Sequence, residues 1–92
     1  MNMSERTLKA IVAGRVQGVF YRASVKQVAE QLGISGYAKN LANGEVEVEA
    51  TGQDLKLIKF TEFLEQGPSK AEVEKVSWDY IQTKQFNGFE VQ

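Results

Sequence analysis

Residues 36–51 of the chain read GYAKNLANGEVEVEAT, and this segment predicts a β-hairpin. Its second strand, residues 45–51, alternates apolar with polar residues, which is typical of a strand with one buried and one wet face. The wet face carries Glu45, Glu47 and Glu49. Between the strands, Asn43-Gly44 favours a tight type I′ turn, since both central residues of that turn need a positive φ. The first strand of the hairpin is expected over residues 36–41.

Two helices and three further strands are predicted on either side of this hairpin. Apolar residues at three- and four-residue spacing indicate one helix from Ala23 to a glycine cap at Gly33, and a second over residues 54–66. Strands are expected over residues 7–13, 71–81 and 89–91. In the strand over 71–81 the apolar parity slips near Glu74-Lys75, which predicts a β-bulge there.

The order of these elements predicts an α+β fold, the ferredoxin-like βαββαβ sandwich. We expect an antiparallel sheet with two helices on one face and a short extra C-terminal strand. The 92 residues make one domain, 1–92, with a polar start, 1–6, that should be frayed. Because the first two strands run parallel in this topology, the loop over 14–22 and the turn over 40–44 should be neighbours at one edge of the sheet.

Composition excludes several classes of function. Eleven Lys and Arg against twelve Asp and Glu leave a net charge of -1, so no nucleic-acid partner is expected. The chain has no Cys and no His, which excludes cysteine phosphatases, phosphohistidine chemistry, Ser/His/Asp triads and zinc sites built from these residues. Composition leaves a carboxylate-bound Mg²⁺ open. No segment has the length of a transmembrane span or the character of a signal peptide, so we expect a cytoplasmic protein without a membrane partner.

The segment GRVQGVFYR, residues 14–22, could hold an anion. Its glycines let successive N–H groups turn inward, and the following helix adds unpaired N–H groups. Arg22 offers a planar fork that can hold two phosphate oxygens. The competing interpretation is a tight turn with a solvated arginine, because two glycines are a weak signal and the Walker pattern is absent.

Asn40 is the second candidate, since Asn is disfavoured near the end of a strand. It could prepare the turn, or its amide could orient a water molecule beside the anion loop. Lys39 and the side chain of Arg15 are interpreted as solvated charges. The aromatic residues are expected in the core or on the sheet surface: Phe20, Tyr37, Trp78 and Tyr80.

The motifs together resemble those of the acylphosphatase family. The resemblance rests on GRVQGVFYR (14–22), Gly33-Ile34, GYAKNL (36–41) and NGEVEV (43–48), and it extends over nearly the whole chain. It implies a metal-independent, cofactor-free enzyme that hydrolyses the carboxyl–phosphate bond of a small acyl phosphate. It also implies that Arg22 binds the phosphoryl group and that Asn40 positions the attacking water. The loop residues that would contribute N–H groups are Arg15, Val16, Gln17, Gly18, Val19, Phe20 and Tyr21.

Two residues depart from the family pattern: Tyr37 stands where Trp is frequent and Lys39 where Arg is common. Both bear on rate or substrate preference. No strong general base is evident, so the substrate's own phosphate is a candidate to take the proton of the water.

Other functions stay open at this point. A phosphate-binding regulatory module could use the same loop without turnover, although pure binding would not need Asn40. Carbamoyl phosphate is a further candidate ligand, because related domains occur within larger carbamoyl-transfer enzymes. An RNA-binding domain is disfavoured by charge and by the missing aromatic signature. A monomer is expected.

Overall fold

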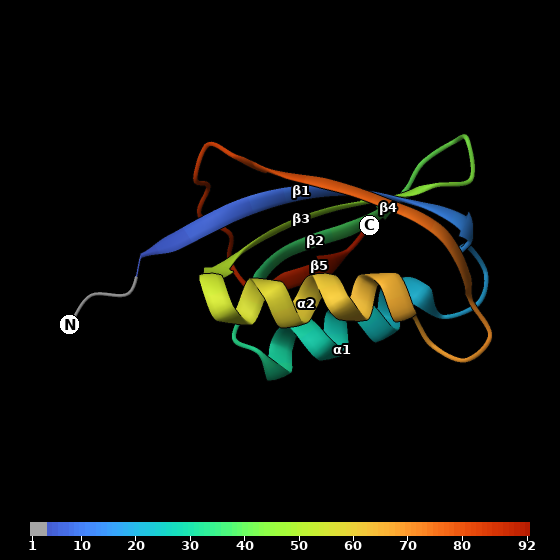
Figure 1. Ribbon diagram of the computed structural model, residues 1–92, viewed down its shortest axis with the longest axis horizontal. Helices are drawn as coiled ribbons and strands as arrows, with labels where there is room; N and C mark the ends of the chain where they lie inside the picture. Colours follow the sequence, from blue (N-terminus) through green and yellow to red (C-terminus); the bar gives the residue numbers. More distant parts are fainter. Residues whose placement is uncertain (1–3) are drawn as a thin grey trace.

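The computed structural model describes residues 4–92, and its elements follow the predicted order (Figure 1). The second helix and the last strand have the predicted bounds, and the ends of the other elements differ from the prediction by at most two residues. In chain order they are β1 (Glu5–Arg15), α1 (Tyr21–Gln31), β2 (Ser35–Asn40), β3 (Val46–Gln53), α2 (Asp54–Gln66), β4 (Glu72–Ile81) and β5 (Phe89–Val91).

The strands form one sheet in the order β4-β1-β3-β2-β5. The first four pair antiparallel, as predicted, and β1 and β2 therefore run in the same direction. β5 pairs with β2 in parallel, so the whole sheet is mixed rather than antiparallel. The reason is the path of the chain: residues 82–88 carry it from β4 at one edge to the opposite edge, where β5 runs alongside β2.

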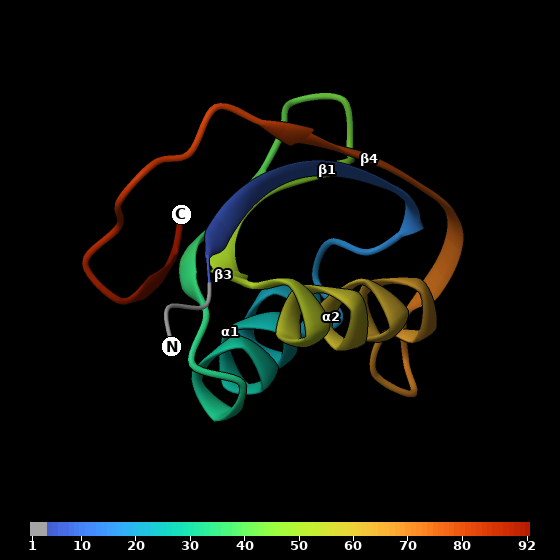
Figure 2. The same ribbon diagram turned by 60° about the vertical axis from the view of Figure 1, so that its left-hand side comes forward.

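Both helices cover one face of the sheet (Figures 1 and 2). The alternating apolar residues of β1 and β3 point toward them, and the helices contribute Val25, Leu57 and Phe60 to the same core. The apolar residues of this core are each less than 5 % exposed. Neither helix of residues 4–92 has the length and apolar character needed to span a membrane.

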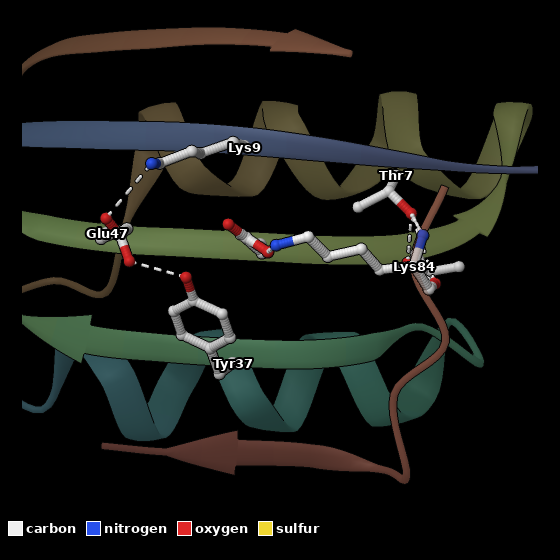
Figure 3. A network of polar contacts seen from close by, with 7 residues as sticks. Thr7, Lys9, Tyr37, Glu47 and Lys84 are labelled. Atoms are coloured by element: carbon white, nitrogen blue, oxygen red, sulfur yellow. Dashed lines mark hydrogen bonds and ion pairs between the residues drawn. The ribbon is translucent and has the colours of Figure 1, made fainter. Parts of the chain in front are cut away.

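The opposite face of the sheet is partly covered by the segment over residues 82–88 (Figure 3). The Lys84 ammonium lies 2.8 Å from Glu49, and the Lys84 carbonyl accepts a hydrogen bond from the Thr51 hydroxyl at 2.8 Å. The Lys84 N–H donates to the Thr7 hydroxyl at 2.8 Å. Glu49 is only 5 % exposed as a result, so the prediction that it lies on a wet face is wrong. The hairpin pattern carries no information about a segment that crosses it later in the chain.

Two predictions about the chain's turns and ends need correction. The hairpin does not use a type I′ turn, because Phe20 is the only non-glycine residue of 4–92 with a positive φ. Instead the Leu41 carbonyl accepts from the Gly44 N–H at 3.2 Å, and Gly44 alone adopts φ 93°. This is a three-residue loop with glycine in the left-handed position. At the polar start, β1 begins at Glu5 and pairs with β3 there, so fraying over 1–6 is contradicted for Glu5 and Arg6. Residues 1–3 lie outside the described part.

The predicted bulge in β4 is confirmed. Ala13 of β1 faces Lys75, whereas the next residue, Gly14, faces Val73, which leaves Glu74 as the extra residue. Gly14 has φ 125°, and a Cβ there would lie 2.2 Å from the Glu72 carbonyl oxygen. The bulge therefore requires glycine at the point where β1 gives way to the loop.

Candidate active site at the loop before α1

The loop over residues 14–22 lies against the β2–β3 hairpin, as the topology predicted. The Gln17 amide nitrogen donates to the carbonyl oxygens of Leu41 and Glu45, both at 2.9 Å. One side chain thus joins the loop to both sides of the hairpin turn, directly after β2 and directly before β3. Sequence reasoning included Gln17 for its backbone and missed this role of its side chain.

The loop is also fastened to the core. Val16 and Tyr21 are each 1 % exposed, and the Tyr21 hydroxyl donates to the Leu64 carbonyl of α2 at 2.7 Å. Burial raises the pKa of the Tyr21 phenol above its ordinary value. The side chains of both residues are therefore structural, and only their backbones can serve the site.

The residue that precedes α1 is Phe20, with φ 63°. A non-glycine residue in this left-handed region costs roughly 1–3 kcal/mol, and only the surrounding structure can maintain it. The ring is 74 % exposed, so burial does not offset that cost. Strain of this kind concentrates at functional sites.

The start of α1 presents unpaired backbone donors. No side chain caps this helix. Within residues 4–92, the N–H groups of Gln17, Gly18, Val19 and Phe20 donate to no backbone or side-chain acceptor of the protein. Free N–H groups at a helix N-terminus attract an anion.

Arg22 and Asn40 share one hydrogen-bond acceptor, the main-chain oxygen of Gln92. Nη1 of Arg22 donates to this oxygen, and the Asn40 N–H donates to it at 3.3 Å. The Asn40 Cα faces that of Val46, whose side chain is buried on the helix face, so the Asn40 side chain points to the same side of the sheet. Its Oδ1 atom is buried and accepts no hydrogen bond from residues 4–92.

Gln92 was not a sequence candidate. Its contribution follows from the parallel pairing of β5 with β2, where the Gln92 N–H donates to Ala38 and the Gly36 N–H donates to Gly88. Lys26 of α1 adds a hydrogen bond to the Phe89 carbonyl at 2.6 Å. A three-residue strand carries no signal for the edge that it joins, so the sequence could not place this oxygen.

A cavity of about 260 Å³ opens at the start of α1, a size suited to a small ligand. Its walls are formed by Val16, Gly18, Phe20, Tyr21, Arg22, Ala23 and Val91. Of the other predicted site residues, Arg15 ends β1 opposite Glu72, Val19 packs against the core, and neither Gln17 nor Asn40 is among the residues that line the cavity.

The two departures from the family pattern lie on the other face of the sheet. Tyr37 and Lys39 alternate with Asn40 along β2, and Tyr37 donates from its hydroxyl to Glu47 at 2.6 Å (Figure 3). This hydrogen bond, with help from Lys9 at 3.6 Å, lowers the pKa of Glu47, although desolvation opposes the shift. Burial and the nearby Glu47 raise the pKa of Tyr37. Neither residue lines the cavity.

Among residues 4–92, no group of three or more Asp and Glu side chains is placed to hold a metal ion. The Asp and Glu residues of the chain are absent from the cavity wall, where Arg22 is the charged residue. The fold and the site together define a small ferredoxin-like domain with an anion-sized cavity beside an arginine at a helix N-terminus.

Comparison with known proteins identifies the family to which this domain belongs. The family model described as Acylphosphatase matches residues 8–91. An acylphosphatase from Legionella pneumophila (strain Paris) is 45% identical over 87 residues, which cover 95% of this chain and 96% of that protein. The structure of an acylphosphatase from Coxiella burnetii superposes with a TM-score of 0.92 at 40% identity, covering 96% of this chain and 93% of the other. The acylphosphatase structure from Bacillus subtilis gives 0.91 at 29% identity, with 97% and 99% covered. The chain belongs to the acylphosphatase family, and it is a hydrolase that acts on acyl phosphates.

Proposed function

We propose that this chain cleaves the carboxyl–phosphate bond by direct attack of water on phosphorus. Arg22 and the N–H groups of the preceding loop hold the phosphoryl group, and Asn40 orients the water. The observation that carries the proposal is the shared Gln92 oxygen, which links the arginine to the asparagine whose amide oxygen has no partner among residues 4–92.

Arg22 is suited to the phosphoryl group by geometry and charge. One N–H group of its guanidinium donates to Gln92, which restrains the side chain, and the remaining donors can face the cavity that Arg22 lines. Two of the loop residues with free N–H groups, Gly18 and Phe20, line the same cavity. Donors held in place before the reaction stabilise the charge on the equatorial oxygens in a loose transition state.

Asn40 supplies a hydrogen-bond acceptor rather than a charge. A buried amide oxygen without a partner costs about 1–3 kcal/mol, so its persistence asks for a functional explanation. A water that donates to this oxygen keeps a lone pair free for phosphorus. The amide thus orients the nucleophile without removing its proton.

The reaction balances without a basic residue of the enzyme. The oxygen of the water forms a bond to phosphorus, and the bond between phosphorus and the carboxylate oxygen breaks. The carboxylate is a weak base and leaves without protonation. The proton of the water passes to a phosphoryl oxygen, which gives a carboxylate and dihydrogen phosphate from an acyl phosphate dianion. The absence of carboxylates among the residues lining the cavity supports this route.

The test is the rate of benzoyl phosphate hydrolysis in EDTA by the wild type and by Arg22→Ala. We expect metal-independent turnover in the wild type and a loss of about 10²–10³ in kcat/KM in the variant, the usual effect of removing one preorganised donor. Lys56→Ala is the matched control, because Lys56 is also a cation in the first turn of a helix and is exposed on α2. It should keep the wild-type rate.

Two results would contradict the proposal. Equal loss in Lys56→Ala and Arg22→Ala would show a general charge effect. No wild-type turnover, together with saturable binding of inorganic phosphate that depends on Arg22, would indicate the regulatory binding module instead.

A further inference from the structure

We propose that Phe20 and Val91 contact the acyl group of the substrate and favour acyl phosphates with an apolar, aromatic or branched acyl group. This inference rests on the proposed function and extends it from the phosphoryl group to the rest of the molecule. It assigns a role to two apolar side chains that the core does not use.

The first observation is the exposure of these side chains. Phe20 is 74 % and Val91 42 % exposed, and both line the cavity that contains Arg22. They come from different elements, since Phe20 precedes α1 and Val91 ends β5. Two exposed apolar residues on the wall of one small cavity form an apolar surface that residues 4–92 leave open to solvent.

The second observation is the conformation of Phe20. Its left-handed φ of 63° would suit glycine or asparagine, yet the position carries a large aromatic ring. Neither the backbone nor the core explains this choice, because the ring is exposed and caps nothing. A contact with a ligand in the adjoining cavity does explain it.

Both residues flank the point where the phosphoryl group would be held. Phe20 lies two positions before Arg22 in the chain, and Val91 directly precedes Gln92, whose oxygen binds Arg22. A substrate with its phosphoryl group on Arg22 and the loop N–H groups has its acyl group at the cavity mouth. There it meets the Phe20 ring and the Val91 methyl groups.

The charges around the cavity favour an acyl group without a charge of its own. Arg22 is the charged residue among those lining the wall, and it is engaged by the phosphoryl group. The nearest acidic residue of β5, Glu90, alternates with Val91 and lines a separate hollow with Tyr37 and Phe86 on the opposite face. No polar side chain other than Arg22 and the buried Tyr21 stands on this wall to recognise a polar acyl group.

The experiment compares kcat/KM for benzoyl phosphate and acetyl phosphate, whose leaving carboxylates have similar basicity. The wild type should favour benzoyl phosphate by about tenfold or more, the discrimination that an apolar contact can provide. Phe20→Gly removes the ring, keeps the N–H group and fits the left-handed backbone. It should reduce the ratio of the two kcat/KM values about tenfold, mainly through the KM for benzoyl phosphate, because the contact is made equally in ground and transition states.

A smaller change and a control complete the design. Val91→Ala should reduce the same ratio by about threefold, since it removes two methyl groups from the wall. Ile58→Ala removes an exposed apolar side chain on α2, 47 % exposed and outside this cavity, and should leave the ratio unchanged.

The inference is overturned if the wild type shows no preference between the substrates, or if Phe20→Gly lowers both rates by one factor and weakens competitive inhibition by inorganic phosphate equally. The latter result would show that the ring shapes the loop rather than contacts the acyl group. Hydrolysis of neither substrate by the wild type would overturn the proposed function, and this inference with it. Hydrolysis of both substrates by the wild type without a preference would overturn this inference alone and leave the proposed function standing.

Discussion

The two faces of the sheet differ in how completely their polar groups are hydrogen-bonded. On the face crossed by residues 82–88, the Thr7 and Thr51 hydroxyls bond to each other at 2.6 Å, and Glu49 is paired with Lys84 (Figure 3). On the helix face, the amide oxygen of Asn40 at the end of β2 has no partner in the described part of the chain, and Phe20 in the neighbouring loop holds a strained backbone. A satisfied network stabilises the fold, whereas unsatisfied groups in one small region are typical of a functional site.

The largest expected effect is a loss of rate in a variant of Asn40 that keeps its stability. Asn40→Ala should lower kcat for benzoyl phosphate by about 10²–10³ and leave inhibition by inorganic phosphate nearly intact. The free energy of unfolding should fall by no more than about 0.5 kcal/mol, because the removed amide oxygen has no partner to lose. Steady-state kinetics and urea denaturation measure the two quantities.

Asn43→Ala is the matched asparagine control in the same hairpin. The Asn43 side chain accepts from the Glu45 N–H at 3.0 Å and donates to its carboxylate at 2.8 Å. This variant should lose about 1 kcal/mol of stability and keep its rate. If Asn40→Ala loses stability in step with activity, Asn40 is a structural residue and the contrast between the two faces fails.

The next prediction concerns the polar network on the face crossed by residues 82–88. Lys84→Met leaves Glu49 buried without its cation and should reduce the free energy of unfolding by about 1–3 kcal/mol, a range lowered because Lys84 is half exposed. Activity per folded molecule should be unchanged. Lys59→Met, an exposed lysine on α2, is the control, and an equal loss in both variants would show that Lys84 acts only as a surface charge.

A smaller, pH-dependent effect concerns Tyr37. The hydrogen bond from Tyr37 lowers the pKa of Glu47 in the folded state, so its contribution to stability is present above the ordinary pKa of Glu and is lost as the pH falls through the lowered value. Tyr37→Phe should therefore cost about 1 kcal/mol at pH 7 and less near pH 3. Urea unfolding of both proteins at the two pH values checks this. A difference that grows in acid would contradict the assignment.

The smallest expected effect measures the backbone strain at Phe20. Phe20→Gly should raise the free energy of unfolding by about 0.5 kcal/mol, because relief of the left-handed conformation exceeds the extra backbone entropy that glycine loses. Thermal or urea unfolding measures it. A loss of more than 1 kcal/mol would instead indicate that the exposed ring packs in the folded state.

Local signals predicted most of the fold. The helix over 54–66 was predicted to the residue, and the parity slip at Glu74 located the bulge, because both features are written in the spacing of apolar residues. The turn at Asn43-Gly44 was assigned the wrong type, since the same pair suits a two-residue and a three-residue loop. The burial of Glu49 depends on residues 82–88, which lie more than thirty positions later.

The candidate site was predictable only in part, because some of its contacts depend on segments that lie far apart in the sequence. Arg22 was a candidate because it follows a glycine-containing loop at a helix start, and Asn40 because Asn is disfavoured near the end of a strand. The resemblance gave them roles. Their shared contact could not be found, because it requires the edge on which β5 docks. The start of α1 at Tyr21 rather than Ala23 follows from the left-handed Phe20, which no propensity anticipates. The roles of Arg22 and Asn40 remain predictions for the variants above.

The anchors of the loop have a consequence for the speed of binding. Gln17 fastens it to the hairpin and Tyr21 to α2, so the conformational entropy that a mobile loop would lose on meeting its ligand is already lost when the chain folds. In the proposed function, the anion enters this preformed site without a slow closure of the loop. Neither binding nor release then depends on a movement of the loop. That suits a catalyst whose product, inorganic phosphate, carries the same group that it must grip in the substrate and then let go.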